Sequence, residues 1–526
     1  MKEKLFHAEK YLFLSLVAVH LLPVILLEYF VTHDGPAHVY SASIIDRLLS
    51  GDLLSAYFYI FNPFPVPNWL GHALLSFLNL FLNGNVSERI IICLYIAGLP
   101  VSFRYFLLAL NPSAQWASYL CFPFIYSLLF YLGFYNFLLG MPVLFFSLTF
   151  LIRHENNLSR KSLIAIALLG LLLYFCHLFA LAFFILAAAA LAATDFFNAL
   201  REKKPKDFFK QIYRKAQWLL IALTPCTLLM LGFLITHREK GDTFGAMIKS
   251  EALYNLFIAR PLITLRFDVE LDYAVTISCA FWLLLLYSIV SFSRNLRFEK
   301  KSVLLVISVL LLIAYFFVPD QLGSGSFVSH RLLMFFYLFA LLWIGTNAIP
   351  KPVRISSSFF FVLISVIFLS YHYEESKSLS NDAREFVSAA DSIKTGSVVL
   401  PVGYSGNWMH ANVSNYISAD KNIVMLDNYE AAMPHFPLEW KKEANPYTGM
   451  NFSSLDVPCT GIEKYQEKIG KQIDYILRWG YNPLSVDSCA RVMDSYIKEK
   501  YERVFISVKK RAEVFRKKKK IIEAGN

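Results

Sequence analysis

Long apolar runs separated by short polar connections fill the first 373 residues of the chain. A membrane-spanning helix needs about 20 predominantly apolar residues, and about eleven stretches reach or approach this length. They are residues 11–31, 69–83, 89–110, 115–132, 134–152, 162–194, 217–235, 272–292, 302–318, 331–348 and 355–373. This pattern predicts a polytopic α-helical membrane protein. We expect 162–194 to be one long helix, because a break at Cys176-His177 would place the later basic loops on the wrong side of the membrane.

After Tyr373 the pattern changes, and charged and turn-forming residues occur throughout. Local periodicity there predicts helices and short strands, which are typical of a small α/β domain. The expected helices are 381–393 and 487–500, the expected strands are 397–402, 422–426 and 473–477, and the expected hairpin is 501–518. We therefore expect a transmembrane domain at 1–373, with a long first outer loop at 32–68, and an α/β domain at 374–526.

Composition supports a membrane protein, because 56% of the residues are apolar and only 17% are charged. The net charge of +11 comes largely from short connections between apolar runs, which argues against nucleic-acid binding. The basic segments 201–206, 294–301 and 351–354 all fall on one side if the N-terminus is cytoplasmic, although loop 153–161 does not fit. The α/β domain is then extracytoplasmic.

An outward-facing α/β domain is compatible with a disulfide bond. Of the seven cysteines, five lie within apolar runs, and only Cys459 and Cys489 lie in the polar C-terminal region. These two cysteines are the candidates for a bridge in an oxidising compartment.

The segment richest in side chains suited to catalysis directly follows the first apolar run. His33, Asp34 and His38 place one carboxylate and two imidazoles beside a Gly-Pro turn, and residues 42–54 form an amphipathic pattern that predicts a helix lying in the membrane interface. A lipid-borne substrate can meet a general base at such a place. In the alternative interpretation, Asp34 only caps the following helix.

A long first outer loop with an acidic residue just after the first helix resembles the GT-C superfamily of polytopic glycosyltransferases. The segment His33-Asp34-Gly35-Pro36-Ala37-His38 carries the resemblance, which extends over residues 1–373. It implies that the substrate donor is a sugar on a polyprenyl phosphate lipid. Many members carry paired acidic residues in this loop, whereas here His33 stands beside Asp34, so the sequence leaves the requirement for a divalent cation open.

The same resemblance implies that Asp34 is the catalytic carboxylate, acting on an acceptor hydroxyl that attacks the anomeric carbon with inversion. His38 is expected to assist or to bind a phosphate oxygen, with His33 beside it as a substrate-binding residue. Glu28 is a second carboxylate near this surface, and its alternative role is that of an interfacial residue whose side chain reaches toward water.

A lipid phosphate leaving group needs cationic hydrogen-bond donors. The outer loop 236–271 contains Arg238, Lys240, Arg260 and Arg266, of which Arg260 and Arg266 lie in an apolar stretch. A second set, His330 and Arg331, follows the glycine-containing segment 323–329 at the start of an apolar run. For each of these residues, anchoring at the membrane interface is the alternative to phosphate binding.

These observations predict an integral-membrane glycosyltransferase at the outer face of a bacterial inner membrane. Its expected partners are the lipid-linked donor, membrane lipids and a glycolipid, glycan or protein acceptor. A transporter, flippase or assembly protein for lipid-linked glycans is the alternative. The chain has no P-loop, dinucleotide fingerprint or HExxH motif, so nucleotide-driven transport has no support in the sequence.

Overall fold

The computed structural model describes residues 2–155, 158–237, 249–294, 301–321, 325–452, 457–480 and 488–519. Arg238, Lys240, Gly323, Ser324 and most of the basic segment 294–301 lie outside the described residues. The chain divides into two compact units. We call Met1–Pro23, Pro65–Leu70 and Ile92–Glu375 the helical unit, and Val24–Phe64, Gly71–Ile91 and Ser376–Asn526 the mixed unit.

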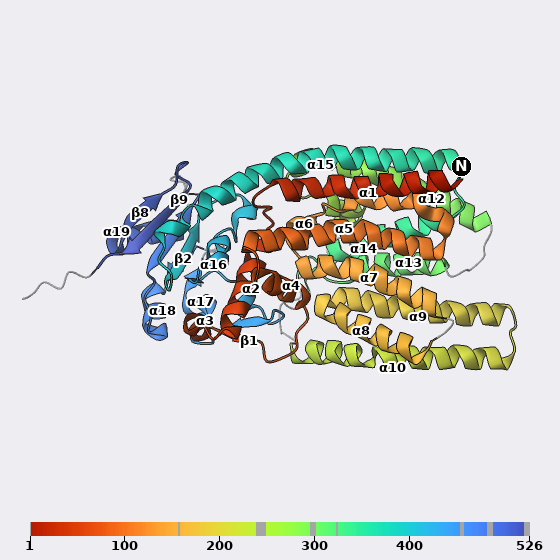
Figure 1. Cartoon of the computed structure of the whole chain (residues 1–526), viewed down its shortest axis with the longest axis horizontal. Coiled ribbons are helices and arrows are strands. Elements are labelled where there is room, and N and C mark those ends of the chain that lie inside the picture. Colours follow the sequence, from red (N-terminus) through yellow and green to blue (C-terminus); the bar gives the residue numbers. More distant parts are fainter. Residues whose placement is uncertain are drawn as a thin grey trace, which may run out of the picture. The chain divides into compact units, whose positions relative to one another are not determined.

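Long apolar helices build the helical unit, and Figure 1 shows α7, α9, α10 and α14 running along one common direction. The helices that contribute to it are α1 (Lys2–Leu26), α5 (Gly84–Leu110), η1 (Pro112–Phe124), α6 (Leu128–Tyr131), α7 (Tyr135–His154), α8 (Arg160–Cys176), α9 (Leu178–Arg201), α10 (Lys206–Thr236), α11 (Lys249–Phe257), η2 (Arg260–Leu262), α12 (Phe267–Arg294), α13 (Ser302–Phe317), α14 (Val328–Thr346) and α15 (Lys351–Val387). Among the described residues, eight helices are long and apolar enough to cross a membrane, and α13 is a shorter apolar helix.

The predicted helix 162–194 is in fact two helices, so that prediction was wrong. His177 has extended backbone angles between α8 and α9, and its Nδ1 accepts a hydrogen bond from the Phe179 amide at 3.1 Å. This bond satisfies one of the free amides at the start of α9. The break lets α8 and α9 pack against each other and against α7 and α10.

Two other predicted apolar helices also differ from the structure. Within 69–83 only α4 (Leu70–Asn79) is helical, and it is too short to span a membrane. The stretch 115–132 is mostly a 3-10 helix followed by the single turn α6. Apolar length alone did not distinguish these segments from membrane spans, because a buried segment of a folded unit is equally apolar.

A five-stranded sheet with the order β3-β2-β7-β9-β8 forms the centre of the C-terminal part of the mixed unit. Strand β2 pairs in parallel with β3 and β7, whereas β9 pairs antiparallel with β7 and β8. Its strands are β2 (Val398–Gly403), β3 (Val424–Met425), β7 (Tyr475–Trp479), β8 (Tyr501–Ile506) and β9 (Ala512–Lys517). These strands and α19 (Ser488–Lys500) confirm the predicted strands, hairpin and C-terminal helix. Strand β2 was recognisable because a buried parallel strand is continuously apolar.

Smaller elements complete the mixed unit, and Cys459 and Cys489 form the expected disulfide bond. The remaining elements are α2 (Gly35–Leu49), α3 (Leu53–Phe58), β1 (Tyr59–Phe61), η3 (Ala390–Ser392), η4 (Trp408–His410), α16 (Asn415–Asp420), η5 (Glu430–Ala432), β4 (Leu438–Trp440), α17 (Pro446–Gly449), β5 (Asn451–Phe452), β6 (Pro458–Thr460) and α18 (Ile462–Ile469). Strand β1 from the first loop pairs antiparallel with β4.

The predicted helix 42–54 is divided in the structure, because α2 ends at Leu49 and α3 begins at Leu53. Every residue from Gly35 to Ile45 is buried, and α2 packs against α16 and η5. Arg47 fixes this packing, because its guanidinium donates to the carbonyl oxygens of Ser418 at 2.6 Å and Lys421 at 2.9 Å, at the C-terminal end of α16. A cation is favourable at that end of a helix.

Candidate active site

Asp34 occupies the N-cap position of α2, but its side chain makes no capping hydrogen bond. The hydroxyl of Thr32 instead accepts the hydrogen bond of the Gly35 amide at 3.1 Å, and Pro36 has no amide hydrogen to satisfy. The carboxylate of Asp34 is thus not used to start the helix, contrary to the structural alternative. Its side chain is 11% exposed, so it is largely enclosed and still reachable.

The groups around Asp34 belong to two distant segments of the mixed unit. His33 places Nε2 3.7 Å from the carboxylate, and the Tyr429 hydroxyl acts on the same group from the C-terminal part of the unit. Burial raises the pKa of Asp34 above its ordinary value, while His33, His38 and the Tyr429 hydroxyl oppose the rise. A carboxyl group whose pKa is moved toward neutrality by burial is suited to take up a proton at physiological pH.

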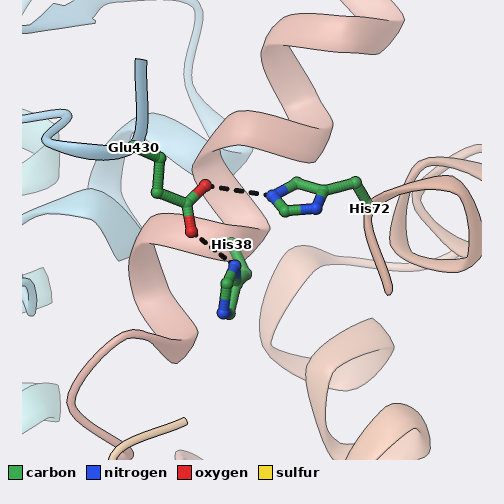
Figure 2. Close-up of side chains that lie close together, drawn as sticks. All are labelled: His38, His72 and Glu430. Carbon is green, nitrogen blue, oxygen red and sulfur yellow. Dashed lines mark hydrogen bonds and ion pairs between the residues drawn. The ribbon is translucent and has the colours of Figure 1, made fainter. Parts of the chain in front are cut away.

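A second cluster lies next to this carboxylate and is formed by His38, His72 and Glu430, as Figure 2 shows. The two oxygens of Glu430 each face one imidazole: His72 Nε2 lies 3.0 Å from Oε2, and His38 Nδ1 contacts Oε1. All three side chains are at most 5% exposed. Burial alone acts to raise the pKa of Glu430, but the charges and hydrogen bonds of His38 and His72 outweigh it and lower the pKa.

Local packing of α2 explains why these groups meet. His38 lies four residues after Asp34, one helical turn along α2, and η5 carries Glu430 against the same helix. His72 comes from α4, and its ring lies edge-on to that of His38 with 5.1 Å between the centroids. Within the mixed unit, three segments far apart in sequence thus supply one buried site.

An aromatic and amide surface adjoins His33. The Nδ1 atom of His33 lies 2.9 Å from the carbonyl oxygen of Trp408, and the rings of the two residues are 5.4 Å apart. Asn412 donates to the carbonyl oxygen of His33 at 2.8 Å. The loop that carries Asp34 is therefore held by η4 and the residues after it, while the Trp408 side chain remains partly exposed.

Glu28 does not join this cluster. Its carboxylate forms an ion pair with Arg384 at 2.7 Å, and both side chains are about half exposed. An exposed ion pair of this kind contributes little to stability. The structure thus places Glu28 at the surface of the mixed unit, where it is paired with Arg384.

In the helical unit, Arg331 and His177 lie together. The Arg331 guanidinium is 3.3 Å from His177 Nε2 and stands over the rings of Phe134 at 4.6 Å and Phe137 at 5.4 Å. Arg331 is only 7% exposed. Because the Nδ1 atom of His177 is used to start α9, its Nε2 atom is directed toward the arginine.

The other candidate cations of the helical unit have separate surroundings. Arg260 donates to the carbonyl oxygen of Ile263 at 2.6 Å, and exposed Arg266 pairs with Asp268 at 3.0 Å. His330 is next to Arg331 in α14, with Nδ1 3.3 Å from the hydroxyl of Ser329. Of the four candidates, His330 and Arg331 are adjacent in α14, whereas Arg266 is already paired with a carboxylate.

Sequence reasoning missed His72, Glu430 and the role of Tyr429 beside Asp34. His72 fell within a segment interpreted as a membrane helix, and Tyr429 and Glu430 lie in the polar C-terminal region, far from Asp34 in the sequence. A polar histidine near the start of the apolar run 69–83 was the one available signal, since no spacing rule connects residues so far apart.

Comparisons with known proteins give evidence at the level of the fold. No protein-family model matches the chain, and no curated protein matches its sequence. Two crystal structures of ArnT from Cupriavidus metallidurans are similar to it at 10% sequence identity, each over 96% of this chain and 97% of ArnT. The TM-score is 0.52 for ArnT bound to undecaprenyl phosphate and 0.53 for ArnT in the apo state. The chain therefore has an ArnT-like fold over nearly all of its length.

Proposed function

We propose that this protein is a membrane glycosyltransferase that transfers a sugar from a polyprenyl-phosphate donor to a hydroxyl group of a glycolipid, glycan or protein. The observation that carries the proposal is the state of Asp34: the carboxylate is buried, is not used as a helix cap and has a raised pKa. The ArnT-like fold supports the donor class, because one of the similar ArnT structures holds undecaprenyl phosphate.

In the proposed reaction, the carboxylate of Asp34 takes the proton from the acceptor hydroxyl. The oxygen then attacks the anomeric carbon of the sugar, and the bond from that carbon to the phosphate oxygen breaks. The polyprenyl phosphate leaves with the bonding electrons, and attack opposite the leaving group inverts the configuration. The Tyr429 hydroxyl opposes the rise in the pKa of Asp34, and His38 is placed one turn further along α2.

The leaving phosphate needs cationic donors, and Arg331 is the strongest candidate in the helical unit. It is buried among aromatic rings with His177 beside it, a setting in which a phosphate anion compensates the cost of a desolvated charge. His330, Arg260 and Arg266 are the further candidates for contacts with the lipid phosphate. The reaction is assigned to the outer face of a bacterial inner membrane, with the N-terminus in the cytoplasm.

The experiment compares cells that lack the protein, cells with wild type and cells with Asp34→Asn at equal expression. Mass spectrometry of envelope glycans and glycolipids is expected to show loss of one sugar-sized mass in both the deletion and the mutant. Asp46→Asn on the same helix is the matched control and should retain the product, because Asp46 bonds Ser76. A normal product pattern in Asp34→Asn, together with an altered pattern in the deletion, would contradict the transferase and favour transport or assembly.

A further inference from the structure

The donor set of the His38, His72 and Glu430 cluster is unusual for a site that only binds sugars. One carboxylate oxygen and two imidazole nitrogens lie within 4.8 Å of one another, and all three residues are buried. Two imidazoles and one carboxylate are one of the three-ligand sets that hold zinc in proteins.

The distances are close to those that coordination requires. With metal–ligand bonds of about 2.0–2.1 Å, the ligand atoms of a tetrahedral ion are roughly 3.3 Å apart. The separation between His72 Nε2 and Glu430 Oε2 is 3.0 Å, and the largest separation in the cluster is at most 4.8 Å. Small rotations of the side chains are sufficient to place all three atoms around one ion.

The charge balance also favours a cation. A buried carboxylate is costly unless a positive charge is next to it. Each oxygen of Glu430 faces an imidazole nitrogen. A divalent ion bound between the three groups supplies a positive charge beside the carboxylate, and ring nitrogens of histidine are common metal ligands.

We propose that His38 Nδ1, His72 Nε2 and Glu430 Oε bind one divalent transition-metal ion of the zinc class. Hard ions such as Mg²⁺ and Ca²⁺ are disfavoured, because they prefer oxygen ligands and the site offers two nitrogens. The ion links α2, α4 and η5 within the mixed unit. Through η5 it fixes Glu430 and the preceding Tyr429, and so it positions the hydroxyl that acts on Asp34.

The first test measures metal content, which does not depend on any transferase activity. The full-length protein is purified in detergent through a tag without histidines and without chelator, and is analysed by inductively coupled plasma mass spectrometry. We expect about one zinc-class ion per chain in the wild type and less than about a tenth of that in His72→Gln and Glu430→Gln. His410→Gln is the matched control, because His410 pairs with Asp382 in the same unit and should leave the metal content unchanged.

A second measurement uses only the wild-type protein, so its result does not depend on whether the variants fold. Wild-type protein is stripped with chelator, dialysed and titrated with Co²⁺, whose visible absorption reports the ligands around it. Strong bands typical of four-coordinate Co²⁺, removed by an equivalent of Zn²⁺, are the expected result. A wild-type protein that contains no metal as purified, retains no Zn²⁺ after dialysis and leaves the Co²⁺ spectrum as in water would overturn the proposal. Such a result leaves the role of Asp34 to be judged by the sugar-transfer experiment alone.

Discussion

The hydroxyl of Tyr429 acts on the carboxylate of Asp34, although the two residues lie far apart in the sequence. Burial raises the pKa of Asp34, and the Tyr429 hydroxyl opposes this rise because it favours the ionised form. The base in the proposed reaction is therefore tuned by a residue in the C-terminal part of the mixed unit.

Replacing Tyr429 tests this relationship. In Tyr429→Phe the pKa of Asp34 should rise further, because one of the groups that lowers it is lost. The acidic limb of the pH–rate profile for sugar transfer is then expected to move to higher pH. At the optimum pH the rate should fall by no more than about tenfold, the value of roughly 1.4 kcal/mol. An unchanged acidic limb would separate Tyr429 from the titration of Asp34.

Asp34 itself should lower the stability of the folded protein at neutral pH. A carboxyl group with a raised folded-state pKa contributes its full stabilisation below its ordinary pKa of about 3.9. This stabilisation is lost as the pH rises through the pKa of the folded state. In chelator-treated protein, Asp34→Asn should therefore have a higher Tm than wild type at pH 7. The difference should shrink as the pH approaches 4. A lower Tm for Asp34→Asn at neutral pH would indicate that the ionised carboxylate has a structural role.

Arg331 is expected to contribute to binding of the lipid phosphate. A hydrogen bond to a charged group is worth about 1.5–3 kcal/mol, so Arg331→Gln should raise the Kd for polyprenyl phosphate by roughly tenfold or more. Arg153→Gln is the control, because Arg153 is also stacked on an aromatic ring, that of Tyr105. Equal Kd values for wild type and Arg331→Gln in well-folded protein would remove Arg331 from the phosphate site.

The proposed orientation in the membrane predicts a pattern of thiol labelling. The five free cysteines are first replaced, and single cysteines are introduced at the exposed positions Ala411 and Lys204. A membrane-impermeant maleimide should label Ala411→Cys in intact spheroplasts and should label Lys204→Cys only after permeabilisation. The reverse pattern would invert the assigned topology.

Local sequence was sufficient where structure depends on neighbours along the chain. The hairpin of β8 and β9 and the buried strand β2 were predicted because alternating or continuous apolar residues suit sheet positions. The break at His177 was not predicted, because the charges of the later loops favoured one continuous helix at 162–194. In the structure His177 has an extended backbone and makes one local contact, with the Phe179 amide, and one tertiary contact, with Arg331.

The candidate site divides in the same way. The sequence by itself determined that Asp34 and His38 lie close together, because only three residues separate them, and that the chain is rich in segments long enough to cross a membrane. Only the tertiary structure decided that Thr32 rather than Asp34 bonds the Gly35 amide, and that Tyr429, Glu430 and His72 meet α2. These contacts depend on packing between segments that no periodicity relates, and packing is a property of the folded chain as a whole.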